Sequence, residues 1–184
     1  WAENDGNAAA IGESFLGVGR RLSNFVYLFI AAGIGGGVIL NHQLWRGVHG
    51  NGGEIGLILP RDMFQMPTLT TLHQSIARAG VAVDSLSDML DRFDPDWPGV
   101  DAWIERSRDP LSQIASSIAA LLDPDAIVIG GRIPRSLAER VIPAIDLYDD
   151  ARRTEPRPLP RIMLSETEYD ACAIGAAMLP LERM

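Results

Sequence analysis

The residue pair with the clearest capacity for chemistry stands near the start of the chain, just before a helix-forming run. Asn4 and Asp5 precede the sequence Ala8-Ala9-Ala10-Ile11-Gly12-Glu13, and side chains of these types accept hydrogen bonds from the unpaired amides that begin a helix. The same amides favour the charged form of a carboxylate, which is the form that general-base chemistry uses. Asn4 and Asp5 are therefore candidate site residues, and simple helix capping is the alternative.

Glycine is concentrated in a short run between two apolar segments. The run Gly33-Ile34-Gly35-Gly36-Gly37 predicts a hairpin with a glycine turn at its tip. Because glycine allows close approach and unusual backbone angles, amides of this run, those of Gly33, Gly35 and Gly36 among them, can face a phosphate. A tight hairpin tip without a ligand is the alternative.

The elements that must position these residues follow the order of an α/β domain. Strands are predicted where apolar β-formers run together, and helices where apolar residues recur every three or four positions. The longest helix is expected to break or kink at Pro110, since proline lacks an amide hydrogen. The predicted strands are 25–30, 38–40, 126–129 and 162–164, and the predicted helices after the first are 68–79, 85–93, 100–122, 136–147 and 170–181.

Composition and charge exclude several classes of function. The 184 residues suffice for one substantial domain, and their net charge of −8 argues against a surface that binds nucleic acid. No apolar run approaches the roughly 18 residues that cross a bilayer, so no membrane contact is expected. The single cysteine, Cys172, cannot form an internal disulfide, which agrees with an expected cytoplasmic location.

Four segments, in order along nearly the whole chain, resemble motifs of the ROK family, a bacterial group of sugar kinases and sugar-responsive repressors. Each motif alone is weak, but their order and spacing make the combined match specific. The segments are E-N-D-G-N-A-A-A-I-G-E at 3–13, A-A-G-I-G-G-G at 31–37, R-G-V-H-G-N-G-G-E-I-G at 46–56, and D-P-D-A-I-V-I-G-G at 123–131 followed by A-I-G-A-A at 173–177.

The resemblance implies an actin-like ATPase fold, related to ribonuclease H, in which a mixed sheet is flanked by helices. It assigns residues 1–184 to the C-terminal lobe, which binds sugar and forms a homodimer, with the helical insertion 68–122 as the expected interface. The family's N-terminal lobe, with its D-x-G-x-T phosphate turn, and any helix-turn-helix domain are expected outside these residues.

The resemblance also implies a sugar site. Asp5 corresponds to the general base that takes a proton from the sugar hydroxyl as it attacks the γ-phosphate of ATP. Asn4, Gly53 and Glu54 correspond to residues around the same sugar. Such a site needs several donors and acceptors, because each ring hydroxyl left unpaired on burial costs about 1–3 kcal/mol. For Glu54, a solvated loop carboxylate is the alternative.

Two groups of glycines correspond to contacts with a nucleotide. Gly33, Gly35 and Gly36 belong to the family's phosphate turn. Gly130 and Gly131 correspond to a glycine pair on the adenosine side, and a strand-to-helix turn is the alternative for this pair.

Three departures from the family's pattern change what the site is expected to do. Ala32 stands where the family has a threonine whose hydroxyl can donate a hydrogen bond to the transferred phosphate. Leu57 stands where it has a zinc-binding histidine, and 60–67 contains no cysteine, so no structural zinc is expected. If 67–70 takes the place of the family's G-C-x-E, Thr70 replaces a second sugar-binding glutamate.

These departures favour the sugar-sensing part of a transcriptional regulator, because a sensor binds sugar without transferring phosphate. An ATP-dependent sugar kinase is the alternative, supported by Asp5 and the glycine run, and only this alternative needs ATP and Mg²⁺. A purely structural oligomerisation domain ranks last. The expected partner is a small-molecule sugar, whose identity the changes at Leu57 and Thr70 leave open.

Overall fold

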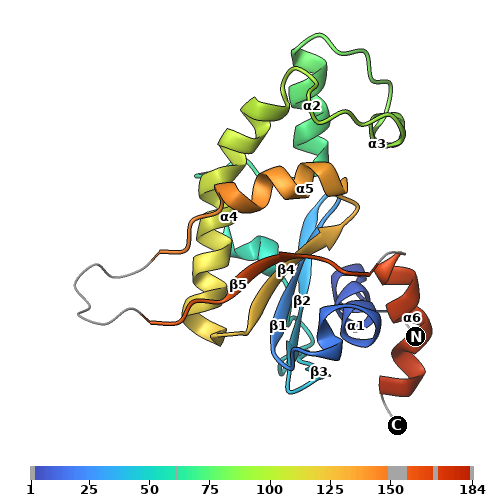
Figure 1. Ribbon diagram of the computed structural model, residues 1–184, viewed down its shortest axis with the longest axis vertical. Helices are drawn as coiled ribbons and strands as arrows, with labels where there is room; N and C mark the ends of the chain where they lie inside the picture. Colours follow the sequence, from blue (N-terminus) through green and yellow to red (C-terminus); the bar gives the residue numbers. More distant parts are fainter. Residues whose placement is uncertain (1–2, 61, 149–156, 168–169, 183–184) are drawn as a thin grey trace.

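A mixed five-stranded sheet in the order β3-β2-β1-β4-β5 lies between two layers of helices (Figure 1). The computed structural model describes residues 3–60, 62–148, 157–167 and 170–182. β1 pairs antiparallel with β2 and parallel with β4, and β5 continues the parallel part. The strands are β1 (Phe25–Ile30), β2 (Ile34–Leu40), β3 (Gln43–Leu44), β4 (Ala126–Gly131) and β5 (Arg161–Leu164). This is the expected actin-like arrangement of a mixed sheet flanked by helices.

The central strand is apolar throughout because both of its faces are covered. All six residues of β1, Phe-Val-Tyr-Leu-Phe-Ile, are buried, and the paired residues of β4 are buried up to Gly130. A sheet with helices on both faces needs no alternation of apolar and polar side chains. The continuous apolar runs in the sequence therefore predicted these two strands correctly.

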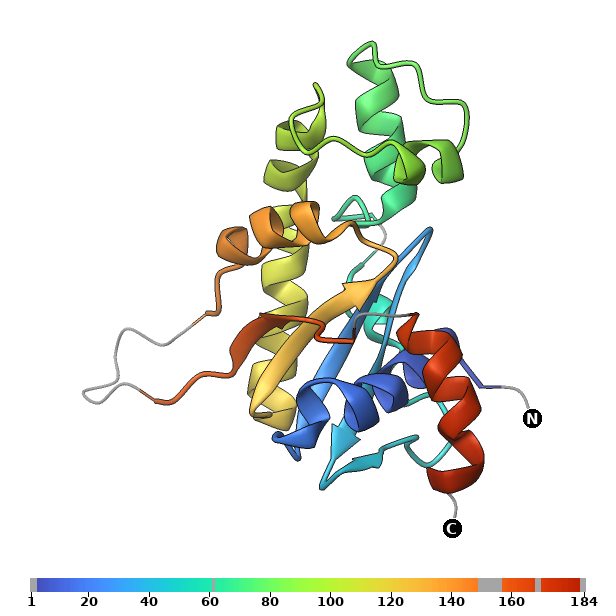
Figure 2. The ribbon, with the colours of Figure 1, turned by 45° about the vertical axis from the view of Figure 1, so that its right-hand side comes forward.

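One face of the sheet is covered by helices from the two ends of the chain, α1 (Asp5–Leu16) and α6 (Ala171–Glu182), which lie side by side in Figures 1 and 2. They touch through glycines. A Cβ atom added to Gly12 would overlap the carbonyl oxygen of Ala171, and one added to Gly175 would overlap the carbonyl oxygen of Ala8. Only glycine at these positions allows the two backbones to come so close.

The opposite face carries α4 (Val100–Leu122) and α5 (Arg135–Val141), while α2 (Leu69–Arg78) and α3 (Leu86–Asp91) extend beyond the sheet (Figure 1). Trp103 of α4 is 2% exposed and donates from Nε1 to Thr71 Oγ1 over 3.0 Å. Ser75 of α2 donates to the carbonyl of Gly99 over 2.8 Å. Both contacts lie within the expected helical insertion and attach α2 to the start of α4.

Several predicted boundaries are confirmed. α1 begins after Asn4, the predicted cap, and α2 and α3 begin at Leu69 and Leu86, within one residue of the predicted starts at 68 and 85. Most of the Pro- and Arg-rich loop expected before the last strand, residues 149–156, lies outside the described residues. Across the described part of the chain, no helix has both the length and the apolar character needed to cross a membrane.

The glycine run differs from its prediction. It was expected to form a turn followed by a strand from Val38, but β2 already begins at Ile34 and contains Gly35, Gly36 and Gly37. The hairpin tip is instead formed by the residues before Ile34. β1 is long enough to pair with the whole run, with Tyr27 opposite Gly37 and Ile30 opposite Ile34, and this ladder outweighs the low strand propensity of glycine.

Two helices also differ from their predictions. Of the break or kink expected at Pro110, the break does not occur, because α4 runs as one helix through this buried residue. The lost helical hydrogen bond is offset because side chains before and after Pro110, Trp103 and Leu111 among them, are buried in the main apolar core. The helix expected over 136–147 ends at Val141 and continues as a 3-10 turn, Ile142–Ala144, because Pro143 has no amide hydrogen.

The contact between α1 and α6 yields a stability prediction. Gly175→Ala should lower the free energy of unfolding by about 1–3 kcal/mol, because the added methyl group must push two helix backbones apart. Denaturant unfolding followed by circular dichroism measures the change. Gly35→Ala is the matched control, since the Cβ position of Gly35 has no atom within 4 Å. Equal stability of the two variants would contradict the proposed packing constraint.

Candidate functional site

Asn4 caps α1, and Asp5 is the first residue of that helix. The Asn4 side chain accepts a hydrogen bond from the Gly6 amide over 2.8 Å, and Asp5 Oδ1 accepts from the same amide over 2.9 Å. The alternative interpretation, that Asn4 serves as a helix cap, is therefore confirmed. Both residues are nonetheless exposed, and among the described residues none donates to Asp5 Oδ2, so this oxygen is available to a ligand.

Three glycine segments meet at the start of α1. A Cβ atom added to Gly6 would lie 2.6 Å from the carbonyl oxygen of Gly36, and one added to Gly53 would lie 2.5 Å from that same oxygen. Gly53 also has a φ of +94°, which favours glycine. Because Gly6 follows Asp5 and Gly53 precedes Glu54, these backbone contacts bring the two predicted loops together on β2.

An ion pair links the same two segments. Glu3 Oε2 accepts from Arg46 Nε over 3.1 Å and from Arg46 Nη2 over 3.0 Å, while Glu3 Oε1 accepts from Asn7 Nδ2 over 3.0 Å. Arg46 is the first residue of the motif at 46–56, which contains Glu54 and which we call the Glu54 loop. Its carbonyl accepts from the Gly52 amide over 2.8 Å, so Arg46 is attached to the part of this loop near Glu54. Burial by itself raises the pKa of Glu3, but the hydrogen bonds from Asn7 and Arg46 outweigh it, so this pKa lies below its usual range.

Asp5 lines a cavity of about 670 Å³, which we call the Asp5 cavity. Gly131 lines it as well, so the structure brings the predicted base and one residue of the predicted nucleotide side to one cavity. Arg132 and Asp170 also line it, and neither was singled out from the sequence. The full lining comprises Asp5, Phe29, Leu90, Gly131, Arg132, Asp170, Ala171 and Cys172.

Glu54 does not line the Asp5 cavity. It is exposed and, together with Gly53, borders a separate groove of about 390 Å³ that also contains Trp45 and Leu121. Any joint action of Asp5 and Glu54 on one ligand would therefore take place outside the walls of the Asp5 cavity, on the surface between the two.

The predicted phosphate glycines have different surroundings. The Cβ positions of Gly33 and Gly35 are open, whereas a Cβ atom on Gly36 would collide with Ile55 and with the carbonyl of Tyr27. Gly36 thus has a packing reason to be glycine. None of the three has a positive φ, so the run offers space for a ligand rather than unusual backbone angles.

A second cavity of about 670 Å³, which we call the Gly130 cavity, lies next to the end of β4 and is also lined by Gly131. A Cβ atom on Gly130 would overlap the hydroxyl group of Tyr27, and Gly131 has a φ of +96°. The Gly131 amide donates to that hydroxyl over 3.0 Å, and burial raises the pKa of Tyr27. Both glycines therefore have a structural role in the turn as well as a place in the cavity wall.

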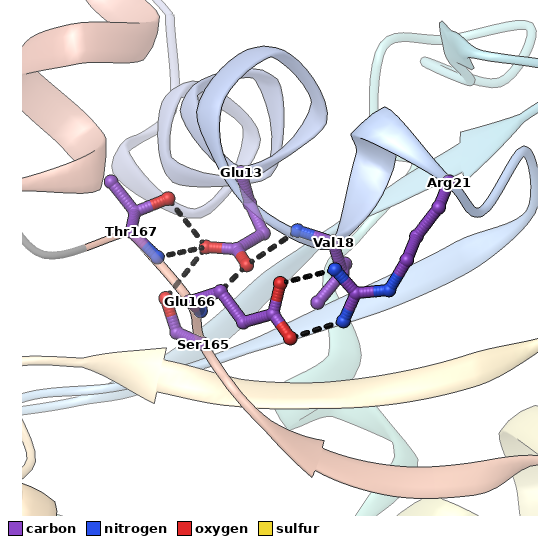
Figure 3. A network of polar contacts seen from close by, with 6 residues as sticks. All are labelled: Glu13, Val18, Arg21, Ser165, Glu166 and Thr167. Atoms are coloured by element: carbon purple, nitrogen blue, oxygen red, sulfur yellow. Dashed lines mark hydrogen bonds and ion pairs between the residues drawn. The ribbon is translucent and has the colours of Figure 1, made fainter.

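A buried glutamate, Glu13, is the centre of a network of polar contacts with residues 165–167 (Figure 3). Glu13 of α1 is 0% exposed. Its carboxylate accepts from Ser165 Oγ over 2.6 Å, from the Glu166 amide over 2.8 Å and from Thr167 Oγ1 over 2.7 Å. Since these three residues line the cavity, Glu13 fixes its wall from the far end of α1. Sequence reasoning gave Glu13 no role, although it ends the first motif.

Three positions, Ala32, Leu57 and Thr70, differ from the motifs of the ROK family. Thr70 Oγ1 donates to the carbonyl of Ala32 over 2.8 Å, so Thr70 attaches α2 to the hairpin tip. Leu57, in the 3-10 turn Ile55–Ile58, is 73% exposed. Within the described ranges, no three His, Cys, Asp or Glu side chains are grouped closely enough to hold a metal ion.

The model of the ROK family matches residues 1–68. The bifunctional enzyme NanE/NanK of Brucella suis is 33% identical over 183 residues, which cover 96% of this chain and 34% of that protein. A ROK family glucokinase from Streptomyces griseus, solved in complex with glucose and AMPPNP, has a TM-score of 0.73 and 24% identity over 97% of this chain and 67% of its own.

Regulators share the fold too. A ROK family transcriptional regulator, described as a homolog of the E. coli MLC protein, has a TM-score of 0.63 and 19% identity over 98% of this chain and 51% of its own. The chain thus spans a third to about half of the length of the first curated relatives it matches, which it covers to 46% and 34%.

The Glu13 network yields a second prediction. Glu13→Gln should lower the free energy of unfolding by about 2–4 kcal/mol, because an amide group places its own N–H bonds against buried donors. Denaturant unfolding measures the loss. Glu139→Gln is the control, since the Glu139 side chain is 53% exposed in a surface ion pair. A loss no larger than that of the control would show that the carboxylate is not needed.

The Glu3–Arg46 pair yields a pH prediction. A carboxylate with a lowered pKa stabilises the fold above its ordinary pKa, and this contribution is lost as the pH falls through the lowered value. In wild-type protein, a ¹³C NMR titration of the Glu3 carboxyl should give a midpoint below 4.5, the usual value. Arg46→Ala should move the midpoint upward, and Arg108→Ala, which removes the distant pair with Asp146, should not. Equal midpoints in the two variants would contradict this account of the link.

Proposed function

Because this chain belongs to the ROK family, we propose that residues 1–184 form the C-terminal, sugar-binding lobe of a longer protein with a role in sugar metabolism. The chain covers only part of each relative, so the second lobe is expected to come from the rest of that protein. The homodimer expected from the resemblance stays a prediction.

The proposed sugar site lies where the three glycine segments meet. Asn4 and Asp5 present exposed polar side chains at the start of α1, and Gly53 carries Glu54 to the neighbouring loop. Carboxylate and amide groups are suited to sugar hydroxyls because they accept the hydrogen bonds that these hydroxyls donate. The Glu3–Arg46 pair would hold the two halves of the site in register.

Of the two functions considered, we favour phosphoryl transfer from ATP to a sugar hydroxyl. The observation that carries this choice is that Asp5 and Gly131 line one cavity. Asp5 would accept the proton of the hydroxyl group. The bond from the γ-phosphorus to the sugar oxygen would form as the bond to ADP breaks, so one ATP gives one ADP and one sugar phosphate. Relatives named as an N-acetylmannosamine kinase of Haemophilus influenzae and a beta-glucoside kinase of Klebsiella pneumoniae support the same choice.

ATP would bind with its Mg²⁺ at the Gly130 cavity. The glycines of that wall and the polar rim, Ser165 to Thr167, supply space and hydrogen-bonding groups of the kind a nucleotide needs. This chain's own part of the reaction is to orient the sugar and hold its proton at Asp5, while the second lobe completes the phosphate site.

A sugar-sensing regulator is the second candidate, and particular residues favour it. Ala32 at the hairpin tip offers no hydroxyl to a phosphate, and Leu57 lacks the imidazole expected at that position. A protein that only senses sugar needs neither group, and a ROK regulator has the same fold.

The two candidates are separated by an assay of ADP release from the full-length protein with a panel of hexoses and amino sugars, N-acetylmannosamine included. Turnover is expected, and Asp5→Asn should lower kcat at least about 100-fold, as loss of a general base does. Asp109→Asn, which changes an exposed carboxylate on α4, should leave kcat unchanged.

If the assay detects no ADP release, calorimetric titration with the same sugars shows whether the protein binds them. Sugar binding without any turnover would reject the kinase and favour the regulator. Turnover that survives Asp5→Asn would reject Asp5 as the base. A wild-type protein that binds no sugar of the panel would contradict the proposed site altogether.

A further inference from the structure

Arg132 is the residue in the Asp5 cavity whose charge suits a phosphorylated ligand. It directly follows β4, and its amide donates to the carbonyl of Ile30 over 2.9 Å, which fixes its backbone beside the sheet. Gly131, with its φ of +96°, turns the chain at this point. The side chain of Arg132 is exposed and lines the cavity together with Asp5.

The guanidinium group of Arg132 has no polar partner among the described residues. Six ion pairs are found among the described residues, and Arg132 takes part in none of them. No hydrogen bond from its side chain to another described residue is found either. The acidic neighbour Asp170 accepts at Oδ1 from the amides of Cys172 and Ala173 over 3.0 and 3.2 Å, and its Oδ2, like that of Asp5, accepts from no described residue. The cavity thus brings the predicted base, Asp5, together with one cation, Arg132.

These two charges together suit a ligand that carries both a hydroxyl and a phosphate. A carboxylate alone repels phosphate oxygens, and a nearby cation removes this repulsion. Arginine does so with paired N–H groups that match the spacing of two phosphate oxygens. Ala32 cannot contribute a hydroxyl at the hairpin tip, so a cation on the β4 side would serve the phosphate instead.

We propose that the Arg132 guanidinium binds phosphate oxygens of a ligand in the Asp5 cavity. The proposal rests on the proposed function, because it places the phosphate beside the sugar hydroxyl held by Asp5. The phosphate has two sources: the γ-phosphate of ATP in a kinase, or the ester of a phosphorylated sugar in a sensor. Arg132 makes and breaks no covalent bond in either case.

The test uses the full-length protein with Arg132→Ala, Arg132→Lys and, as control, Arg108→Ala, which removes an arginine of an exposed ion pair on α4. The kinase arm measures kcat/KM for ATP and the affinity for ADP. Arg132→Ala should lower kcat/KM for ATP about 10- to 100-fold, as loss of a charge-assisted hydrogen bond does. The affinity for ADP, which lacks the γ-phosphate, should change less than threefold, and Arg132→Lys should restore part of the loss.

The sensor arm measures calorimetric affinities for glucose and glucose 6-phosphate. Arg132→Ala should weaken binding of the phosphate ester about 10- to 100-fold and leave glucose binding unchanged, whereas Arg108→Ala should affect neither. A response in one arm only identifies the source of the phosphate.

The inference is overturned if the wild type binds sugar but neither ATP nor the ester responds to Arg132→Ala, or if ADP and ATP are affected equally. Absence of sugar binding by the wild type would instead defeat the proposed function, so the two failures are distinguishable.

Discussion

Close approach of backbones through glycine is the constraint on which the rest of this structure depends. Gly12 and Gly175 let α1 touch α6, and Gly6, Gly36 and Gly53 let α1, β2 and the Glu54 loop meet at one place. A side chain at any of these positions would push the elements apart by the width of a methyl group or more. The candidate sugar site lies on this contact, so its geometry is set by packing and not only by its own polar groups.

Polar contacts of Glu13 and Glu3 then hold α1 to segments that are distant in the sequence. Glu13 is fully buried, and a buried carboxylate is tolerated only when its oxygens are well supplied with donors. Those donors come from residues 165–167 at the other end of the chain. The carboxylate therefore joins α1, which carries Asp5 at its start, to the wall of the neighbouring cavity. The Glu3–Arg46 pair performs the same task between α1 and the Glu54 loop.

The charge arrangement around Asp5 bears on the choice between a kinase and a sensor. Judged from motifs alone, the missing threonine at Ala32 favoured a sensor. The cavity adds an arginine that no motif contained, and it lies on the same wall as Gly131. A cation that lines the same cavity as the proposed base gives a phosphate a place in this lobe under either function. Phosphoryl transfer ranks first because Asp5 and Gly131 line that cavity together.

Much of the fold was predictable from local patterns. The apolar runs of β1 and β4 are buried on both faces, and the caps Asn4, Thr68 and Ser85 mark helix starts through side chains that bond to nearby amides. The extent of β2 was not predictable, because its glycines pair with β1 only through the register of the hairpin. The same holds for Pro110, which packing retains inside α4.

The sequence by itself determined the family resemblance, the helix caps and the presence of Asp5 and Glu54, because these depend on residue types and short spacings. Only the tertiary structure decided that Asp5 shares its cavity with Arg132, that Glu54 borders another groove, and that Glu13 holds the 165–167 segment. These residues are separated by many positions along the chain. Their proximity follows from sheet order and from helix contacts that no local pattern records.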